Sequence, residues 1–125
     1  MNRTVAWEGG FSFIEVLIGL IFLVIGILAF ASLQIASVRG NAFSHNLMQA
    51  TYCGQDGLES LKNLPFQSPE MRSGNHSAGQ VTVSGVGFDR SYTVVSEANL
   101  KKIDYAVRWN DGVDHRIVFS TIRSQ

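Results

Sequence analysis

The chain has 125 residues, a length that allows one small domain. Ten basic and ten acidic side chains cancel, which excludes the strong overall basic field that attracts nucleic acid or an anionic membrane. Hydrophobic residues make up 46% of the chain and charged residues only 16%, and the charges are unevenly distributed. We therefore do not expect a freely soluble cytosolic enzyme with a deep cleft.

A long run without charge extends from Val16 to Val38. As a helix, its 23 residues would be about 34 Å long at 1.5 Å per residue, enough to cross the hydrocarbon core of a membrane. We therefore expect residues 11–38 to form a transmembrane helix, with a domain of about 85 residues outside the membrane.

Three interpretations of this apolar run are open. In the first, it is a secretory signal peptide removed after Ala31, because residues 29–31 form an A-x-A-like cleavage site. The region ahead of the apolar core should then be positive, but residues 1–15 contain one arginine and two glutamates. In the second, the run is a plain single-pass anchor, whose orientation is left undecided by Arg3 and Arg39 on its two flanks. The third interpretation starts from Glu15.

Glu15 begins the apolar helix, where an ionised carboxylate is costly and signals a function. The residues from Gly9 to Ile18 read GGFSFIEVLI. They closely resemble the class III signal of type IV pilins and type II secretion pseudopilins, in which Gly-Phe-Ser/Thr-x-x-Glu precedes an apolar helix. The resemblance implies that a prepilin peptidase removes residues 1–10 as a leader, cutting between Gly10 and Phe11. The same enzyme methylates the new amine of Phe11, and Glu15 becomes the fifth residue of a 115-residue product.

A charge pair gives this interpretation a physical basis. The new α-amine of Phe11 is positive at neutral pH, and Glu15 neutralises it from one helical turn away or from an adjacent subunit. Two lone charges inside a low-dielectric helix bundle are very costly, whereas a close pair is tolerated, so the pair sets the axial register between subunits. The leader departs from the family in one respect: its Arg3 is opposed by Glu8, while family leaders are usually basic.

The helical pattern continues beyond the membrane segment, and we expect an amphipathic half over residues 39–64. One helix of about 50 residues should therefore run from near Phe11 to Asn63, because Pro65 stops it. Its apolar stripe comprises Ala36, Gly40, Phe43, Leu47, Ala50, Gly54, Leu58 and Leu61. The other faces should carry the polar residues Asn41, His45, Asn46, Gln49, Gln55, Asp56 and Glu59. Gly40, Gly54 and Gly57 weaken the helix, which should bend or lean on something.

After the helix we expect a loop over residues 65–80 and an antiparallel sheet over residues 81–125. The alternating stretches are 81–83, 88–95, 103–109 and 113–122. A three-residue hairpin loop, Asn110 to Gly112, would pair Trp109 with Val113, Tyr105 with Ile117 and Ile103 with Phe119. It would also set Arg108 against Asp114 and Val107 opposite His115, with Gly112 in the left-handed conformation. A two-residue turn would pair apolar with charged side chains, so the three-residue loop is favoured.

The fold class expected is therefore α+β and pilin-like: a long N-terminal helix against a small C-terminal antiparallel sheet. The apolar sheet face comprises Ile103, Tyr105, Trp109, Val113, Ile117 and Phe119, and its partner on the helix is the stripe with Phe43, Leu47, Leu58 and Leu61. About twenty residues at the C-terminal end also look similar to V-type minor pilins and I-type minor pseudopilins.

No catalytic, metal or cofactor site can be singled out. The three histidines, His45, His76 and His115, have no ligand spacing, and the lone Cys53 should be a small, half-buried helix residue. Asn110, Asp111 and Asp114 could hold calcium, but a turn explains them. Lys101 and Lys102 should form a solvated strand edge. We therefore expect no enzyme, cofactor, small-molecule substrate or nucleic-acid partner.

The expected function is that of a minor type IV pilin, a structural subunit incorporated into a pilus or priming its assembly. Its partners would be prepilin peptidase, other pilin or pseudopilin subunits and the inner membrane, with the C-terminal domain in the periplasm before assembly and in the fibre at the cell surface afterwards. A minor pseudopilin of a type II secretion system has the same fold, processing and glutamate. An exported soluble binding domain, cleaved after Ala31, is the alternative from another class.

Overall fold

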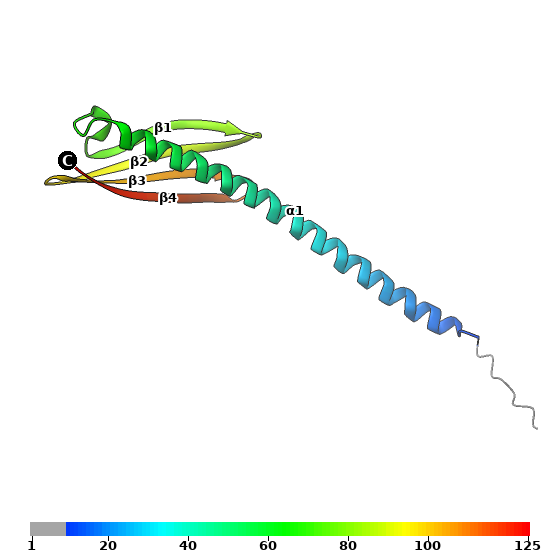
Figure 1. Cartoon of the computed structure of the whole chain (residues 1–125). Helices are drawn as coiled ribbons and strands as arrows, with labels where there is room; N and C mark the ends of the chain where they lie inside the picture. Colours follow the sequence, from blue (N-terminus) through cyan, green and yellow to red (C-terminus); the bar gives the residue numbers. More distant parts are fainter. Residues whose placement is uncertain (1–9) are drawn as a thin grey trace, which may run out of the picture. The chain divides into compact units, whose positions relative to one another are not determined.

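The computed structural model describes residues 10–125, so most of the expected leader lies outside the described residues. One long helix, α1 (Phe13–Asn63), is followed by a short 3-10 helix, η1 (Pro69–Met71), and four strands (Figure 1). The strands are β1 (Gly74–Val83), β2 (Val86–Glu97), β3 (Leu100–Asn110) and β4 (Asp114–Ser124). They form one antiparallel sheet in the order β1-β2-β3-β4. The α+β, pilin-like fold class is therefore confirmed.

The chain divides into two compact units, one that ends at Gly40 and one from Asn41 to Gln125. In the first unit, α1 is long and apolar enough to span a membrane, a property that a signal sequence near an N-terminus shares. All of its large apolar side chains between Phe13 and Val38 are exposed. This surface is compatible with a membrane anchor.

The second unit contains the core, where residues 41–63 of α1 pack against one face of the sheet. Five residues of α1 are buried there: Asn46, Ala50, Gly54, Gly57 and Leu61. The buried apolar residues from the rest of the unit are Met71, Phe88, Tyr92, Val94, Ile103, Tyr105, Ala106, Val107 and Trp109. The expected packing of the apolar stripe under the sheet is thus confirmed from Leu47 to Leu61, whereas Phe43 is 40% exposed. Asn46 was expected on a polar face and is buried instead.

Two glycines bring the backbone of α1 close to the sheet. A Cβ atom at Gly54 would overlap the ring of Phe119, and one at Gly57 would overlap the ring of Tyr105. Gly40, in contrast, has no atom within 4 Å of the position of its Cβ. The expectation that the glycine-containing outer half leans on something is confirmed for Gly54 and Gly57, which lie directly against aromatic rings.

The expected loop over residues 65–80 is wrong from Gly74 onward, because β1 begins there. Residues 74–80 lack the alternation of apolar and polar residues that predicts a strand, but they pair with β2. His76 stacks on Tyr92 with ring centroids 4.8 Å apart, and Thr93 Oγ1 donates to Asn75 Oδ1 at 2.7 Å. A register shift between Ser77 and Gly79 accommodates the irregular sequence. Tertiary pairing, rather than local pattern, makes this edge strand.

The expected β3–β4 register is wrong by two residues, and the loop is residues 111–113. Trp109 pairs with His115 instead of Val113, and Arg108 pairs with Arg116 instead of Asp114. The side chain of Asn110 closes the turn, because its Nδ2 donates to Asp114 Oδ1 at 2.5 Å and its Oδ1 accepts the Gly112 N–H at 2.9 Å.

A shift of two residues preserves the side of the sheet on which each side chain lies. Ile103, Tyr105 and Trp109 are therefore buried as expected, while Ile117 is half-buried and packs against this core. Val113 was expected on the same face but is 64% exposed in the loop. Gly112 has a φ of +108°, which confirms its expected left-handed conformation.

Two cations of the sheet hold the segment that follows α1. Lys101 Nζ donates to the carbonyl of Phe66 at 2.5 Å and lies 4.4 Å from the centre of that ring, while Arg123 Nη1 donates to the carbonyl of Leu64 at 2.5 Å. The expectation of a solvated pair is therefore wrong for Lys101, which is buried. It holds for Lys102, whose exposed ammonium pairs with Asp104 at 3.2 Å.

We predict that a glycine-to-alanine substitution destabilises the protein at Gly57 but not at Gly40. Gly57→Ala should lower the free energy of unfolding by about 1–3 kcal/mol, because the new methyl group displaces Tyr105 from its place in the core. Gly40→Ala should leave stability unchanged or raise it by up to about 1 kcal/mol, through helix propensity alone. Thermal unfolding of the detergent-solubilised chain measures both. A stabilised Gly57→Ala variant would contradict the packing described.

Candidate processing and assembly site

The Gly10–Phe11 peptide bond lies in an exposed segment ahead of α1. Gly10, Phe11 and Ser12 are not helical, and the side chain of Phe11 is 83% exposed. A Cβ at Gly10 would meet no atom within 4 Å. Such a segment is accessible to a peptidase, because its backbone is neither part of a helix nor covered by side chains.

Glu15 lies in the first turn of α1. The carbonyl of Ser12 accepts hydrogen bonds from the N–H groups of Glu15, at 2.9 Å, and Val16, at 3.2 Å. A carboxylate in the first turn is favoured by the positive end of the helix dipole. Glu15 is exposed and forms no ion pair with any of residues 10–125. Its charge is therefore available to a group outside the described chain.

The three expected site residues, Gly10, Phe11 and Glu15, thus lie within six consecutive residues, at the start of the uncovered apolar surface of α1. Phe11 and Glu15 are separated by four residues, about one helical turn. Chemically, the arrangement offers an accessible bond at Gly10, a position for a new amine and one carboxylate. Their roles in cleavage, methylation and assembly are proposals, and they are taken up below.

In the second unit, a polar contact ties the β3–β4 loop to α1. Asn46 Nδ2 donates to Asp111 Oδ2 at 2.9 Å, and His115 Nε2 lies 2.9 Å from Asp111 Oδ1. The ring of His115 lies between Phe43 and Trp109, with centroid distances of 5.0 Å and 5.1 Å. Asn46 therefore compensates for its burial by fixing the loop that carries Asp111.

The pKa of Asp111 is lowered, chiefly by the hydrogen bond from the Asn46 amide and further by His115 and by the indole N–H of Trp109, while desolvation opposes them. The indole does not reach hydrogen-bond geometry. Its Nε1 is the buried side-chain polar atom without a hydrogen-bond partner among the described residues. Trp109 therefore adds an electrostatic contribution near Asp111 rather than a full hydrogen bond.

The acidic residues around the loop are engaged within the protein. Asp111 accepts from Asn46, and Asp114 accepts from Asn110. Among residues 10–125, no group of three or more His, Cys, Asp or Glu side chains is arranged to hold a metal ion. The turn explanation of these residues therefore fits the geometry. Cys53 is half-buried on α1, as expected.

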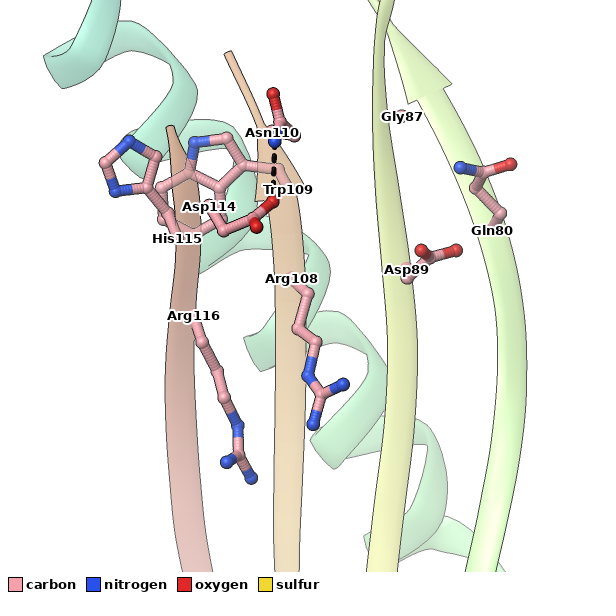
Figure 2. Close-up of a pocket in the computed structure, with 9 residues that line it drawn as sticks. All are labelled: Gln80, Gly87, Asp89, Arg108, Trp109, Asn110, Asp114, His115 and Arg116. Carbon is pink, nitrogen blue, oxygen red and sulfur yellow. Dashed lines mark hydrogen bonds between the residues drawn. The ribbon is translucent and has the colours of Figure 1, made fainter. Parts of the chain in front are cut away.

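The face of the sheet away from α1, here called the outer face, has a hollow of about 620 Å³ near the same loop (Figure 2). It is lined by Gln80, Gly87, Asp89, Arg108, Trp109, Asn110, Asp114, His115 and Arg116. Figure 2 shows Arg108 and Arg116 side by side on β3 and β4, extending along the strands away from Asn110 and Asp114. This surface therefore carries charges of both signs, with two arginines next to each other.

Comparison of the chain with models of protein families, with curated proteins and with solved structures gives no match. The functional interpretation of residues 10–15 therefore depends on their sequence pattern and on their position at the start of α1. The outer-face arginines were not singled out in the sequence, because the expected register placed Arg108 opposite Asp114 rather than opposite Arg116.

We predict that Asp111 gives the second unit a stability that depends on pH. Because the pKa of Asp111 is lower in the folded protein than its ordinary value, its contribution is full above that value and is lost as the pH falls through the folded value. Wild-type protein should therefore be more stable than Asp111→Asn above about pH 5, and the difference should shrink toward about pH 2. Denaturant unfolding at several pH values measures it.

Asn46→Ala provides the matched control, since the Asn46 amide is the main cause of the lowered pKa. In this background the pH-dependent difference between Asp111 and Asp111→Asn should become smaller. An equal dependence on pH in wild type and Asp111→Asn would refute the assignment.

Proposed function

We propose that the chain is a minor type IV pilin, a structural subunit without catalytic activity. A prepilin peptidase would remove the leader after Gly10, and α1 would carry the product into a pilus-like fibre. One coincidence supports this proposal. The sequence Gly10-Phe-Ser-Phe-Ile-Glu15 lies in an exposed segment at the start of a helix that is long and apolar enough to span a membrane.

The charge on Glu15 explains how such a subunit would find its place. Cleavage after Gly10 would create an amine at Phe11, and bundled helices would exclude water from both charges. An amine paired with a carboxylate is tolerated there, whereas either charge alone costs several kcal/mol. A subunit docked at the wrong height would leave both charges unpaired. The pair would therefore select one axial register among many that are equally apolar.

The uncovered surface of α1 fits the same role. Its large apolar side chains from Phe13 to Val38 are all exposed, and Glu15 is the sole charged residue in this stretch. Lipid would cover this surface before assembly, and neighbouring helices would cover it afterwards. The second unit has its own core and would stay outside the membrane in both states.

A minor pseudopilin of a type II secretion system is the second candidate. The same residues favour it, because the N-terminal pattern is common to both families and the C-terminal end looks similar to members of both. The machinery encoded by neighbouring genes distinguishes the two. An exported domain released after Ala31 remains the candidate from a different class.

The first test is the N-terminus of the membrane-extracted protein, determined by intact mass with prepilin peptidase present and absent. We expect a peptidase-dependent product that begins at methylated Phe11. Gly10→Val should abolish this product, whereas the matched Gly9→Val should retain it, because the bond after Gly10 is the one cut. A product that begins at Ser32, or an uncut chain in both strains, would exclude the pilin assignment.

A second test separates processing from assembly. Glu15→Gln should be cut and methylated normally, but the amount incorporated into fibres should fall at least about tenfold. The amine of Phe11 would then be unpaired, and each 1.4 kcal/mol that this costs lowers incorporation by a factor of ten. Glu15→Asp keeps the charge and should assemble better than Glu15→Gln. Sheared fibres quantified by immunoblot provide the measurement. Wild-type incorporation of Glu15→Gln would show that the carboxylate does not set register.

A further inference from the structure

The two edges of the sheet differ in how their backbone groups are used. β1 has a register shift between Ser77 and Gly79 in its pairing with β2. Arg90 fills this irregularity, because its guanidinium donates to the carbonyl of Ala78 at 2.9 Å and to that of Gly79 at 3.4 Å. A bulge of this kind protects an edge strand against further pairing. β1 is therefore a closed edge.

β4, at the opposite edge, has no such protection (Figure 1). It pairs with β3 from Asp114 to Ser124 without a register shift, and it contains neither proline nor glycine. Among residues 10–125, no backbone group of residues 114–124 forms a backbone hydrogen bond with any segment other than β3. Every second residue of β4 therefore directs its N–H and C=O away from the sheet.

The middle of β4 is suited to pairing with another extended chain. Residues 117–122 read IVFSTI, an uncharged stretch of mostly β-branched and aromatic residues. Arg116 and Arg123 flank it, and flanking charges limit indiscriminate aggregation of such a stretch. Arg123 donates to the carbonyl of Leu64, whereas Arg116 is exposed. A strand that pairs here therefore meets the free charge of Arg116.

Arg108 and Arg116 form a row on the outer face, and their charges are compensated to different degrees. Asp89 on β2 lies directly opposite Arg108 and offsets its charge. Asp114, two residues before Arg116, accepts from Asn110, and Figure 2 shows the Arg116 side chain extending away from it. Arg116 forms no ion pair with any of residues 10–125. A carboxylate on the free side of β4 would give it a cross-strand partner.

An apolar hollow of about 290 Å³ lies toward the other end of β4, on the same outer face. It is lined by Val95, Glu97, Leu100, Lys102 and Ile122, and its three apolar side chains are exposed. Ile122 is the residue that β4 contributes, so a large apolar side chain placed opposite it would cover this surface. Ile122 and Arg116 are six residues apart, about 20 Å along the strand.

We propose that the free edge of β4 binds an extended segment of a different protein, which adds a fifth, antiparallel strand to the sheet. This segment carries a large apolar residue opposite Ile122 and, six residues later, a carboxylate opposite Arg116. Main-chain hydrogen bonds to β4 supply the affinity, and the two side chains supply the selection. The second unit alone carries this inference, which goes beyond the proposed function and does not depend on it.

A second copy of the chain does not fit this edge. The acidic residue of β4 is Asp114, at its start. Antiparallel pairing of two β4 strands with Asp114 opposite Arg116 overlaps them only from Asp114 to Arg116. Parallel pairing about a two-fold axis sets Arg116 opposite Arg116. β1 of a second copy has no acidic residue and is closed by its bulge. The carboxylate therefore has to come from another protein.

Amide hydrogen exchange of the full chain in detergent tests the backbone contact. The probe is a synthetic nine-residue peptide of threonine and valine, with leucine at its second position and glutamate at its eighth. Without peptide, every second amide of β4 should exchange rapidly. Peptide at up to about 1 mM should slow these amides at least about tenfold and leave β1 unchanged. Unaltered exchange in β4, protection of β1, or β4 amides already slow in dilute protein would each overturn the proposal.

Charge exchange tests the selection. A matched peptide with lysine in place of glutamate should bind the wild-type chain at least about threefold more weakly, and Arg116→Glu should invert this preference. Arg72→Glu, an exposed control elsewhere in the unit, should leave the preference as in wild type. Unchanged thermal unfolding midpoints show that the variants fold. Equal binding of both peptides to wild type would overturn the role of Arg116.

This inference and the proposed function fail separately. A chain that is processed to Phe11 but whose β4 amides are not protected by the peptide overturns the edge contact alone. A chain that binds the peptide but is never processed overturns the proposed function alone.

Discussion

The close approach of α1 to the sheet is the constraint on which the second unit depends. Gly54 and Gly57 let the helix backbone lie against the rings of Phe119 and Tyr105, where any side chain would collide. Once the helix is held at this distance, Asn46 reaches Asp111 at the loop end, and Lys101 and Arg123 reach the carbonyls that follow the helix. One side of α1 and the outer face of the sheet are left for partners. The glycines that reduce helix propensity are therefore the residues that make the packing possible.

Much of this arrangement could be predicted from the sequence, because its main signals are local. The charge-free run, the apolar stripe and Pro65 define one helix, and alternation in residues 103–109 identifies a half-buried strand. Residues 74–80 carry no such signal, since pairing with β2 makes them a strand. The burial of Asn46 could have been inferred: it lies four residues before Ala50, in line with Gly54. The sequence pattern places a polar residue such as Asn46 on an exposed face, because it does not show that the partner of Asn46 is Asp111, 65 residues away.

The register error shows where pattern reasoning stops. The predicted pairing of Trp109 with Val113 places both side chains on the apolar face of the sheet. The structure instead pairs Trp109 with His115 and leaves Val113 exposed to solvent. Ring stacking and the side-chain contacts of Asn110 outweigh one buried valine. Because a shift of two keeps every side chain on its side, the core prediction survived while the cross-strand neighbours changed. The Arg108–Arg116 row arises from this difference. For Gly10, Phe11 and Glu15, the sequence pattern remains the main argument, since the partners proposed for them are other molecules.

The contacts of Lys101 and Arg123 have a consequence for the order of folding. Both donate to carbonyls just after α1, yet they lie 35 and 59 residues further along the chain. The end of the helix therefore cannot be fixed until β3 and β4 exist. Because the helix comes first in the chain, residues 41–63 cannot be fully docked before the last strand has been made. Loop closure over such distances is slow compared with helix formation. The amphipathic half of α1 is thus exposed to other molecules until the sheet is complete, and its docking marks the completion of folding.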